Sequence, residues 1–187
     1  MNNLYRKLKL SFDPLTPDFP KAVGTYEHCE DVTMFEYDTH TLDYRLLQLI
    51  DSCGLSIVKS EIFYNPPHTT VPVHVDTSQF SNMVKLNIHI GSPSCTISWY
   101  TPLAKYANKP PKKTQLDTEY LSYDDHEVSL LFNQEVDNIS FMNAGLPHGF
   151  TNHTDDPSWL LSLAILKDGS NLQFDEALHI FKEYIER

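Results

Sequence analysis

The sequence predicts a mainly β, antiparallel fold with flanking α-helices, and three observations support this class. Short segments rich in β-branched and aromatic residues follow one another through the middle of the chain. Pro, Gly, Asn and Asp turn signals separate them, as in β-sandwiches and barrels. Segments with helical periodicity lie before and after this region. At 187 residues the chain can bury one sizeable core, so a single domain over residues 1–187 is expected.

The first helix is expected over residues 41–53, where apolar side chains recur every three or four positions. Gly54 follows it as the expected left-handed C-terminal cap. The closing helix is expected over residues 172–186, with an apolar stripe from Phe174 to Ile185 that packs on the core. Two helices therefore flank the predicted β core.

The strands are expected at residues 55–65, 71–76, 83–91, 95–100, 127–132, 136–144 and 159–166. Trp99, near the end of one strand, is expected in the core. Residues 102–126 contain adjacent prolines and no periodicity. A long loop inside a compact domain is often a functional lid, so we expect this segment to be a substrate lid or a plain insertion.

Charge and composition exclude several kinds of partner. The net charge is −11 and only three arginines are present, which opposes binding to nucleic acid. No stretch approaches the roughly 18 apolar residues that span a bilayer. The three cysteines form no C-x-x-C motif, which favours free thiols in a reducing compartment. A cytoplasmic protein with no nucleic-acid or membrane partner is therefore expected.

One short strand carries the first candidate metal ligands. In "TTVPVHVDTS", residues 69–78, His74 and Asp76 are two positions apart and so project from the same face of the strand. They are either two metal ligands or two polar residues on a solvated sheet face. A second H-x-D tripeptide, at His153 and Asp155, shows that the motif alone is weak evidence.

A distant histidine supplies a possible third ligand. His148 follows a Gly-Leu-Pro turn at the end of a predicted strand, and another strand begins shortly after it. Two imidazoles and one carboxylate on one face of a metal leave further positions open, as in non-haem Fe(II) oxygenases. Open positions distinguish a reactive site from a closed structural zinc site.

These segments resemble a known family. Over residues 57–166, "IFYNPPHTTVPVHVDTSQFSNMVKLNIHI" and "FMNAGLPHGFTNHTDDPSWLLSLAI" are similar to Fe(II)- and 2-oxoglutarate-dependent oxygenases, in the aspartyl/asparaginyl β-hydroxylase and prolyl-hydroxylase-like branch. The resemblance implies a double-stranded β-helix, a jelly roll of the cupin type. It also implies Fe(II) bound by His74, Asp76 and His148, 2-oxoglutarate as co-substrate, and hydroxylation of a C–H bond.

The sequence departs from the family at one position. The family usually carries an arginine for the far carboxylate of 2-oxoglutarate where this chain has Ser158. A buried carboxylate without a cationic partner is costly. Lys85 is the predicted replacement, because it is the only lysine or arginine between Glu61 and Leu103 and lies on the strand where some relatives carry a lysine for this role. It shares one strand face with Asn87 and His89, opposite an apolar face. That polar face is expected either to line the roll or to meet water.

Further polar groups complete the predicted co-substrate site. Tyr64, Asn87 and Ser158 are expected to add hydrogen bonds beside Lys85. The substrate is expected to be an amino acid, a peptide side chain or a small metabolite. The rival hypothesis is a cupin-like metal- or ligand-binding protein without 2-oxoglutarate oxygenase activity. A zinc hydrolase is disfavoured, because no glutamate adjoins either ligand histidine to act as a general base.

Overall fold

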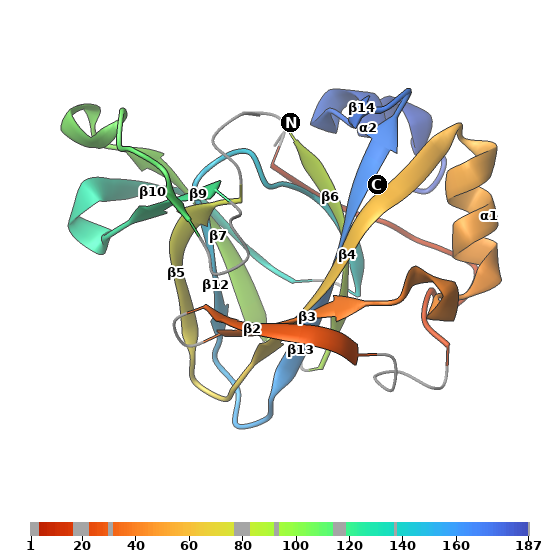
Figure 1. Cartoon of the computed structure of the whole chain (residues 1–187), viewed down its shortest axis with the longest axis horizontal. Coiled ribbons are helices and arrows are strands. Elements are labelled where there is room, and N and C mark those ends of the chain that lie inside the picture. Colours follow the sequence, from red (N-terminus) through yellow and green to blue (C-terminus); the bar gives the residue numbers. More distant parts are fainter. Residues whose placement is uncertain are drawn as a thin grey trace.

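The chain folds into two antiparallel β-sheets that face each other, with helices against one of them (Figure 1). The computed structural model describes residues 4–16, 23–29, 32–76, 83–91, 94–113, 119–136 and 138–186. The predicted mainly β class with flanking helices is therefore confirmed.

The larger sheet has eight strands, which come from the beginning, the middle and the end of the chain. Their order across the sheet is β1 (Tyr5–Lys7), β11 (Ile139–Asn143), β6 (Val84–Ile90), β13 (Ser158–Lys167), β4 (Leu55–Asn65), β3 (Val32–Tyr37) and β2 (Val23–Cys29). The short β14 (Ser170–Asn171) pairs with β13. Strands β1, β2 and β3 were not predicted from the sequence.

The smaller sheet has six strands and carries the candidate metal ligands. Their order is β10 (Val128–Glu135), β7 (Cys95–Pro102), β12 (His148–Asn152), β5 (Thr70–Val75), β9 (Glu119–Tyr123) and β8 (Lys112–Lys113). Strand β12, which begins at His148, was not predicted, because Gly and Pro surround its short apolar core.

From β4 to β7 and from β10 to β13, consecutive strands alternate between the two sheets. The chain passes from β4 in the larger sheet to β5 in the smaller, back to β6, and on to β7. After β10 in the smaller sheet it alternates again through β11, β12 and β13. The inner strands are therefore ordered β11-β6-β13-β4 in one sheet and β10-β7-β12-β5 in the other. This winding is a double-stranded β-helix, as the resemblance implied.

The helices cover the outer face of the larger sheet. Helix α1 (Tyr44–Ser52) lies beside β4, and α2 (Phe174–Ile180) lies near the C-terminal end of the chain (Figure 1). Gly54 ends α1 with φ of +69°, as predicted. Helix α2 is shorter than the predicted span of 172–186, because turns replace helix after its first two turns.

Two main clusters of apolar side chains form the core. The first joins the outer face of the larger sheet to the helices, through residues such as Leu86, Leu161 and Phe181. The second lies between the sheets and contains Trp99 and Phe150. Trp99 is completely buried, which confirms its predicted core position. Neither helix in the described residues is long and apolar enough to cross a membrane.

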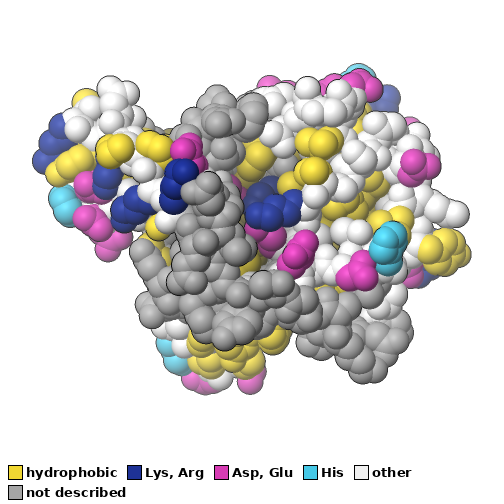
Figure 2. Space-filling model, in the orientation of Figure 1, with side chains coloured by type: hydrophobic (Ala, Val, Ile, Leu, Met, Phe, Trp, Pro, Cys, Tyr) yellow, Lys and Arg dark blue, Asp and Glu magenta, His cyan; other side chains and the backbone are white. Residues whose placement is uncertain are grey.

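The predicted loop at 102–126 has more regular structure than expected. It contains the 3₁₀ helices η2 (Ala104–Tyr106) and η3 (Asp125–Glu127) and strands β8 and β9, of which β9 pairs with β5. Residues 114–118 lie outside the described residues. The β8–β10 region projects from the body (Figure 1), and lysine side chains gather on it (Figure 2). Its pairing to β5 extends the sheet that carries the candidate ligands.

Candidate metal centre

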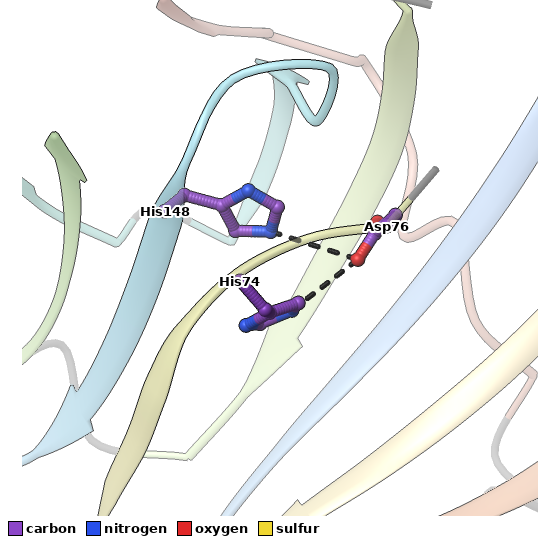
Figure 3. A group of neighbouring side chains, drawn as sticks. All are labelled: His74, Asp76 and His148. Carbon is purple, nitrogen blue, oxygen red and sulfur yellow. Dashed lines mark ion pairs between the residues drawn. The ribbon is translucent and has the colours of Figure 1, made fainter. Parts of the chain in front are cut away.

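The three predicted metal ligands lie together at one end of β5 and β12. The two strands are neighbours, and His74 is the direct cross-strand partner of His148. Asp76 immediately follows β5. Its Oδ1 is 3.2 Å from His74 Nε2 and 3.8 Å from His148 Nε2, and one ligand atom from each residue lies within 4.8 Å of the others. Figure 3 shows both imidazoles directed at the same carboxylate oxygen.

The backbone fixes which nitrogen each histidine offers. His74 Nδ1 donates to the carbonyl oxygen of Pro72, and His148 Nδ1 donates to that of Leu146, each at 2.8 Å. A carbonyl oxygen can only accept, so each Nδ1 carries a proton. Each neutral ring therefore keeps its Nε2 lone pair for a metal, and the hydrogen bond fixes the orientation of the ring.

The charges of the site favour a carboxylate and at least one neutral imidazole. Burial opposes ionisation of Asp76, but the Lys85 ammonium and the hydrogen bond with His74 hold the pKa of Asp76 well below its usual range. Burial and the nearby His74 lower the pKa of His148 to about 4. Burial also opposes charge on His74, yet Asp76 outweighs it and raises the pKa of His74. His148 is therefore neutral at pH 7 and can bind a cation.

A glycine lets the two ligand strands approach closely. A β-bulge lies between His148 and Phe150 where β12 pairs with β5. A Cβ atom on the intervening Gly149 would lie 3.0 Å from the carbonyl oxygen of Val71. A larger residue there would push the two strands apart. Gly149 therefore helps to keep the imidazoles of His74 and His148, which lie on neighbouring strands, close to each other.

Lys85 reaches the site from the larger sheet. It is 7% exposed, and its Nζ lies 2.7 Å from Asp76 Oδ2. Asn87 and His89 on the same face of β6 are also buried, whereas the other face packs into the helix-side core. The predicted alternation is confirmed. Of the two expected environments for the polar face, the interior of the roll is the one observed.

Part of this polar interior lacks hydrogen-bond partners. Among the described residues, no group bonds Asn87 Oδ1 or Ser140 Oγ, and these two residues are cross-strand partners. Ser158 is also buried, and its Oγ lies 3.3 Å from His89 Nε2. Unpaired buried polar atoms are costly, so a bound molecule or ordered water near Asn87 would satisfy them.

Tyr64 is not brought to the metal ligands. It is an odd number of residues from Glu61 along β4, so it lies on the opposite face of the strand. Its ring packs on Trp159 at a centroid distance of 4.6 Å, and Trp159 packs against the helix-side core. The position of Tyr64 therefore does not support the predicted hydrogen bond to a co-substrate beside Lys85.

Glu61 is a buried charged residue that sequence reasoning missed. Its Oε2 lies 3.5 Å from Lys85 Nζ, and its Oε1 forms an ion pair with Lys59. The sequence held one signal, an acidic residue next to Ile62 within the strand predicted at residues 55–65, and the structure places that strand between β13 and β3. An acidic residue at such a position needs a cationic partner.

A second group of possible ligands lies in the β8–β10 region. Asp124, His126 and Glu127 are close enough to hold an ion. Glu127, however, already forms an ion pair with Lys109 and accepts a hydrogen bond from the backbone N–H of Asp124. These contacts give Glu127 a structural role in η3, so this group is a weaker candidate than the one at His74.

Comparison with known proteins adds information on the fold. No protein-family model matches the chain, and no curated protein matches it significantly. The X-ray structure of E. coli ycfD matches with a TM-score of 0.50 and 14% identity, covering 86% of this chain and 49% of that one. The chain thus spans about half the length of that protein. This likeness supports the fold assignment.

Two further solved structures resemble the chain more distantly. One is a 2OG-Fe(II) oxygenase family oxidoreductase from Burkholderia pseudomallei, with a TM-score of 0.43 and 9% identity over 79% of this chain and 76% of that one. The other is a mutant of the Bacillus subtilis oxalate decarboxylase OxdC, with a TM-score of 0.40 and 13% identity over 80% of this chain and 29% of that one.

Proposed function

We propose that the protein is a mononuclear non-haem iron oxygenase that uses 2-oxoglutarate to hydroxylate a C–H bond of an amino acid, a peptide side chain or a small metabolite. The observation that carries this proposal is the convergence of His74, Asp76 and His148 at one end of a double-stranded β-helix. Two imidazoles and a carboxylate with open positions are the ligand set of non-haem Fe(II) oxygenases.

The donor atoms fit a divalent iron ion. His74 and His148 would bind it through Nε2, since each Nδ1 is held by a backbone carbonyl. Asp76 would bind it through Oδ1, which both imidazoles face. Iron and 2-oxoglutarate together would supply the oxidising chemistry, and the protein would supply placement of the substrate and exclusion of water.

Lys85, Asn87 and Ser158 are the proposed co-substrate residues. Lys85 is the only lysine or arginine among the buried side chains of the described residues. Its ammonium has three N–H donors, of which two are directed at Asp76 and Glu61, so one is left for a carboxylate of 2-oxoglutarate. Asn87 Oδ1 lacks a partner among the described residues and would order a bridging water or a hydroxyl donor.

A second candidate function is a cupin-like metal- or ligand-binding protein that does not use 2-oxoglutarate. The observation that favours it is the charge around Lys85. Asp76 and Glu61 already pair with this lysine, so a further carboxylate would meet a cation that two anions partly neutralise. This candidate retains the metal ligands but has no 2-oxoglutarate oxygenase activity.

Anaerobic titration separates the two functions. With Fe(II) bound, addition of 2-oxoglutarate to the oxygenase is expected to produce a weak visible charge-transfer band that saturates at one molecule per chain. On admission of air, the sample should convert 2-oxoglutarate to succinate. Bound iron with neither band nor succinate would contradict the oxygenase proposal and support the metal-binding alternative.

A further inference from the structure

The two oxygens of the Asp76 carboxylate have different partners. Oδ1 faces the two histidine Nε2 atoms, at 3.2 and 3.8 Å. Oδ2 lies 2.7 Å from Lys85 Nζ, a distance typical of a hydrogen bond between an ammonium group and a carboxylate. The carboxylate is thus held through the oxygen that neither histidine faces.

We propose that Lys85 and Glu61 are positioning residues that hold Asp76 through Oδ2, so that Oδ1 alone remains for the metal. This inference rests on the proposed metal site, but not on the use of 2-oxoglutarate. It gives Lys85 a role in metal binding, in addition to the contact with a co-substrate proposed above.

Glu61 fixes the position of Lys85. Lys85 projects from β6 and Glu61 from β4, and β13 lies between these strands in the larger sheet. Glu61 is 8% exposed, so its contact with Lys85 is shielded from water. Lys59 holds the other Glu61 oxygen. The contacts therefore form a chain from Lys59 through Glu61 and Lys85 to Asp76, which crosses from the larger sheet to the smaller.

Positive and negative side chains alternate along this series of ion pairs for a physical reason. A buried lysine is stable as a cation only when anions surround it, and Lys85 has two. The side chain of Lys85 is therefore fixed at one end by its strand and at the ammonium end by contacts with Asp76 and Glu61.

Positioning and simple electrostatics predict opposite effects of removing Lys85. A cation next to a metal ligand repels the metal, so its loss would tighten metal binding if charge alone mattered. If Lys85 orients Asp76, its loss instead frees the carboxylate to rotate and weakens metal binding. Outer contacts that orient a ligand typically contribute about 10- to 100-fold in metal affinity.

The test is titration of the full chain with Mn(II) or Co(II) in the absence of 2-oxoglutarate. Lys85→Met is expected to bind the metal at least about tenfold more weakly than the unchanged protein. Lys85→Arg, which keeps the cation and its hydrogen bond, should recover most of this loss. Lys85→Met with unchanged or tighter metal binding would overturn the proposal.

Lys59→Met is the matched control. Lys59 is also a lysine that contacts Glu61. It lies at the outer end of the series of ion pairs that leads to Asp76, and its side chain is 47% exposed. Its replacement is expected to change metal affinity by less than about threefold, as for an exposed ion pair. An equal loss of metal affinity in Lys59→Met and Lys85→Met would show that the loss does not depend on the contact with Asp76, and would also overturn the proposal.

Glu61→Gln provides a second variant should Lys85→Met fail to fold. This change removes the anion that fixes Lys85 but leaves every metal ligand in place. The visible absorption of the Co(II)-loaded protein reports the ligand geometry and is expected to change in Glu61→Gln. An unchanged spectrum and an unchanged metal affinity would contradict the inference.

These outcomes are separate from those of the oxygenase proposal. If metal binding depended on Lys85 but 2-oxoglutarate produced no band, this inference would stand and the oxygenase proposal would be contradicted. If the unchanged protein showed the 2-oxoglutarate band and Lys85→Met kept its metal affinity, the oxygenase proposal would stand and this inference would be wrong.

Discussion

Replacing Asp76 with alanine is expected to lower the affinity for Fe(II) or Mn(II) by at least about 100-fold, and to abolish iron-dependent succinate formation. The loss exceeds the roughly 10- to 100-fold effect of groups that only orient a ligand, because Asp76 would be the single anionic ligand. The change also leaves Lys85 with Glu61 as its only carboxylate partner among the contacts described above. Calorimetric titration with Mn(II) measures the affinity.

Asp155→Ala is the matched control for this prediction. Asp155 belongs to the other H-x-D tripeptide, but its side chain is 98% exposed and pairs with His68 at the surface. Its removal is expected to leave metal affinity unchanged. If Asp76→Ala retained the affinity of the unchanged protein, or Asp155→Ala lost it, the assignment of the ligands would be wrong.

Replacing Trp99 with alanine is expected to reduce the free energy of unfolding by about 3–5 kcal/mol, as for other large aromatic residues in a core. Trp99 is completely buried between the sheets, where its ring contacts Tyr5 and Phe132. Its Nε1 also donates to the carbonyl oxygen of Asn143 at 2.9 Å. Urea-induced unfolding of the metal-free protein measures this change.

The same substitution should also weaken metal binding, because Trp99 is the direct cross-strand partner of His148. Leu130→Ala on β10 is the control, since Leu130 is 58% exposed and its removal should change stability by less than about 0.5 kcal/mol. A Trp99→Ala protein as stable as Leu130→Ala would contradict the packing described for the space between the sheets.

Most strands of the β-rich region could be predicted from the sequence, but the way in which they pair could not. Alternation and turn signals located β4 to β7, β10, β11 and β13, because those strands have strong β-forming residues and clear boundaries. Alternation also placed Lys85 and Asn87 on one face. Which strand pairs with which depends on contacts between residues far apart in the sequence, and the alternation within one strand does not identify its partner. The double-stranded β-helix was expected from the family resemblance alone.

The candidate site shows the same limit. His74 and Asp76 could be paired from their spacing, because two residues on one strand face are necessarily close. His148 is brought to them by the β5–β12 register and by the close approach at Gly149, which are properties of the folded chain. Glu61 was missed because it belongs to no ligand motif and acts through its burial and its contact with Lys85.

The most direct test of the metal centre is a crystal structure grown with Mn(II) or Fe(II) under anaerobic conditions, with anomalous diffraction to locate the ion. We expect one ion bound by His74 Nε2, Asp76 Oδ1 and His148 Nε2, with Lys85 still bonded to Asp76 Oδ2. An ion held instead at Asp124, His126 and Glu127, or one that contacts neither His74 nor His148, would contradict the account.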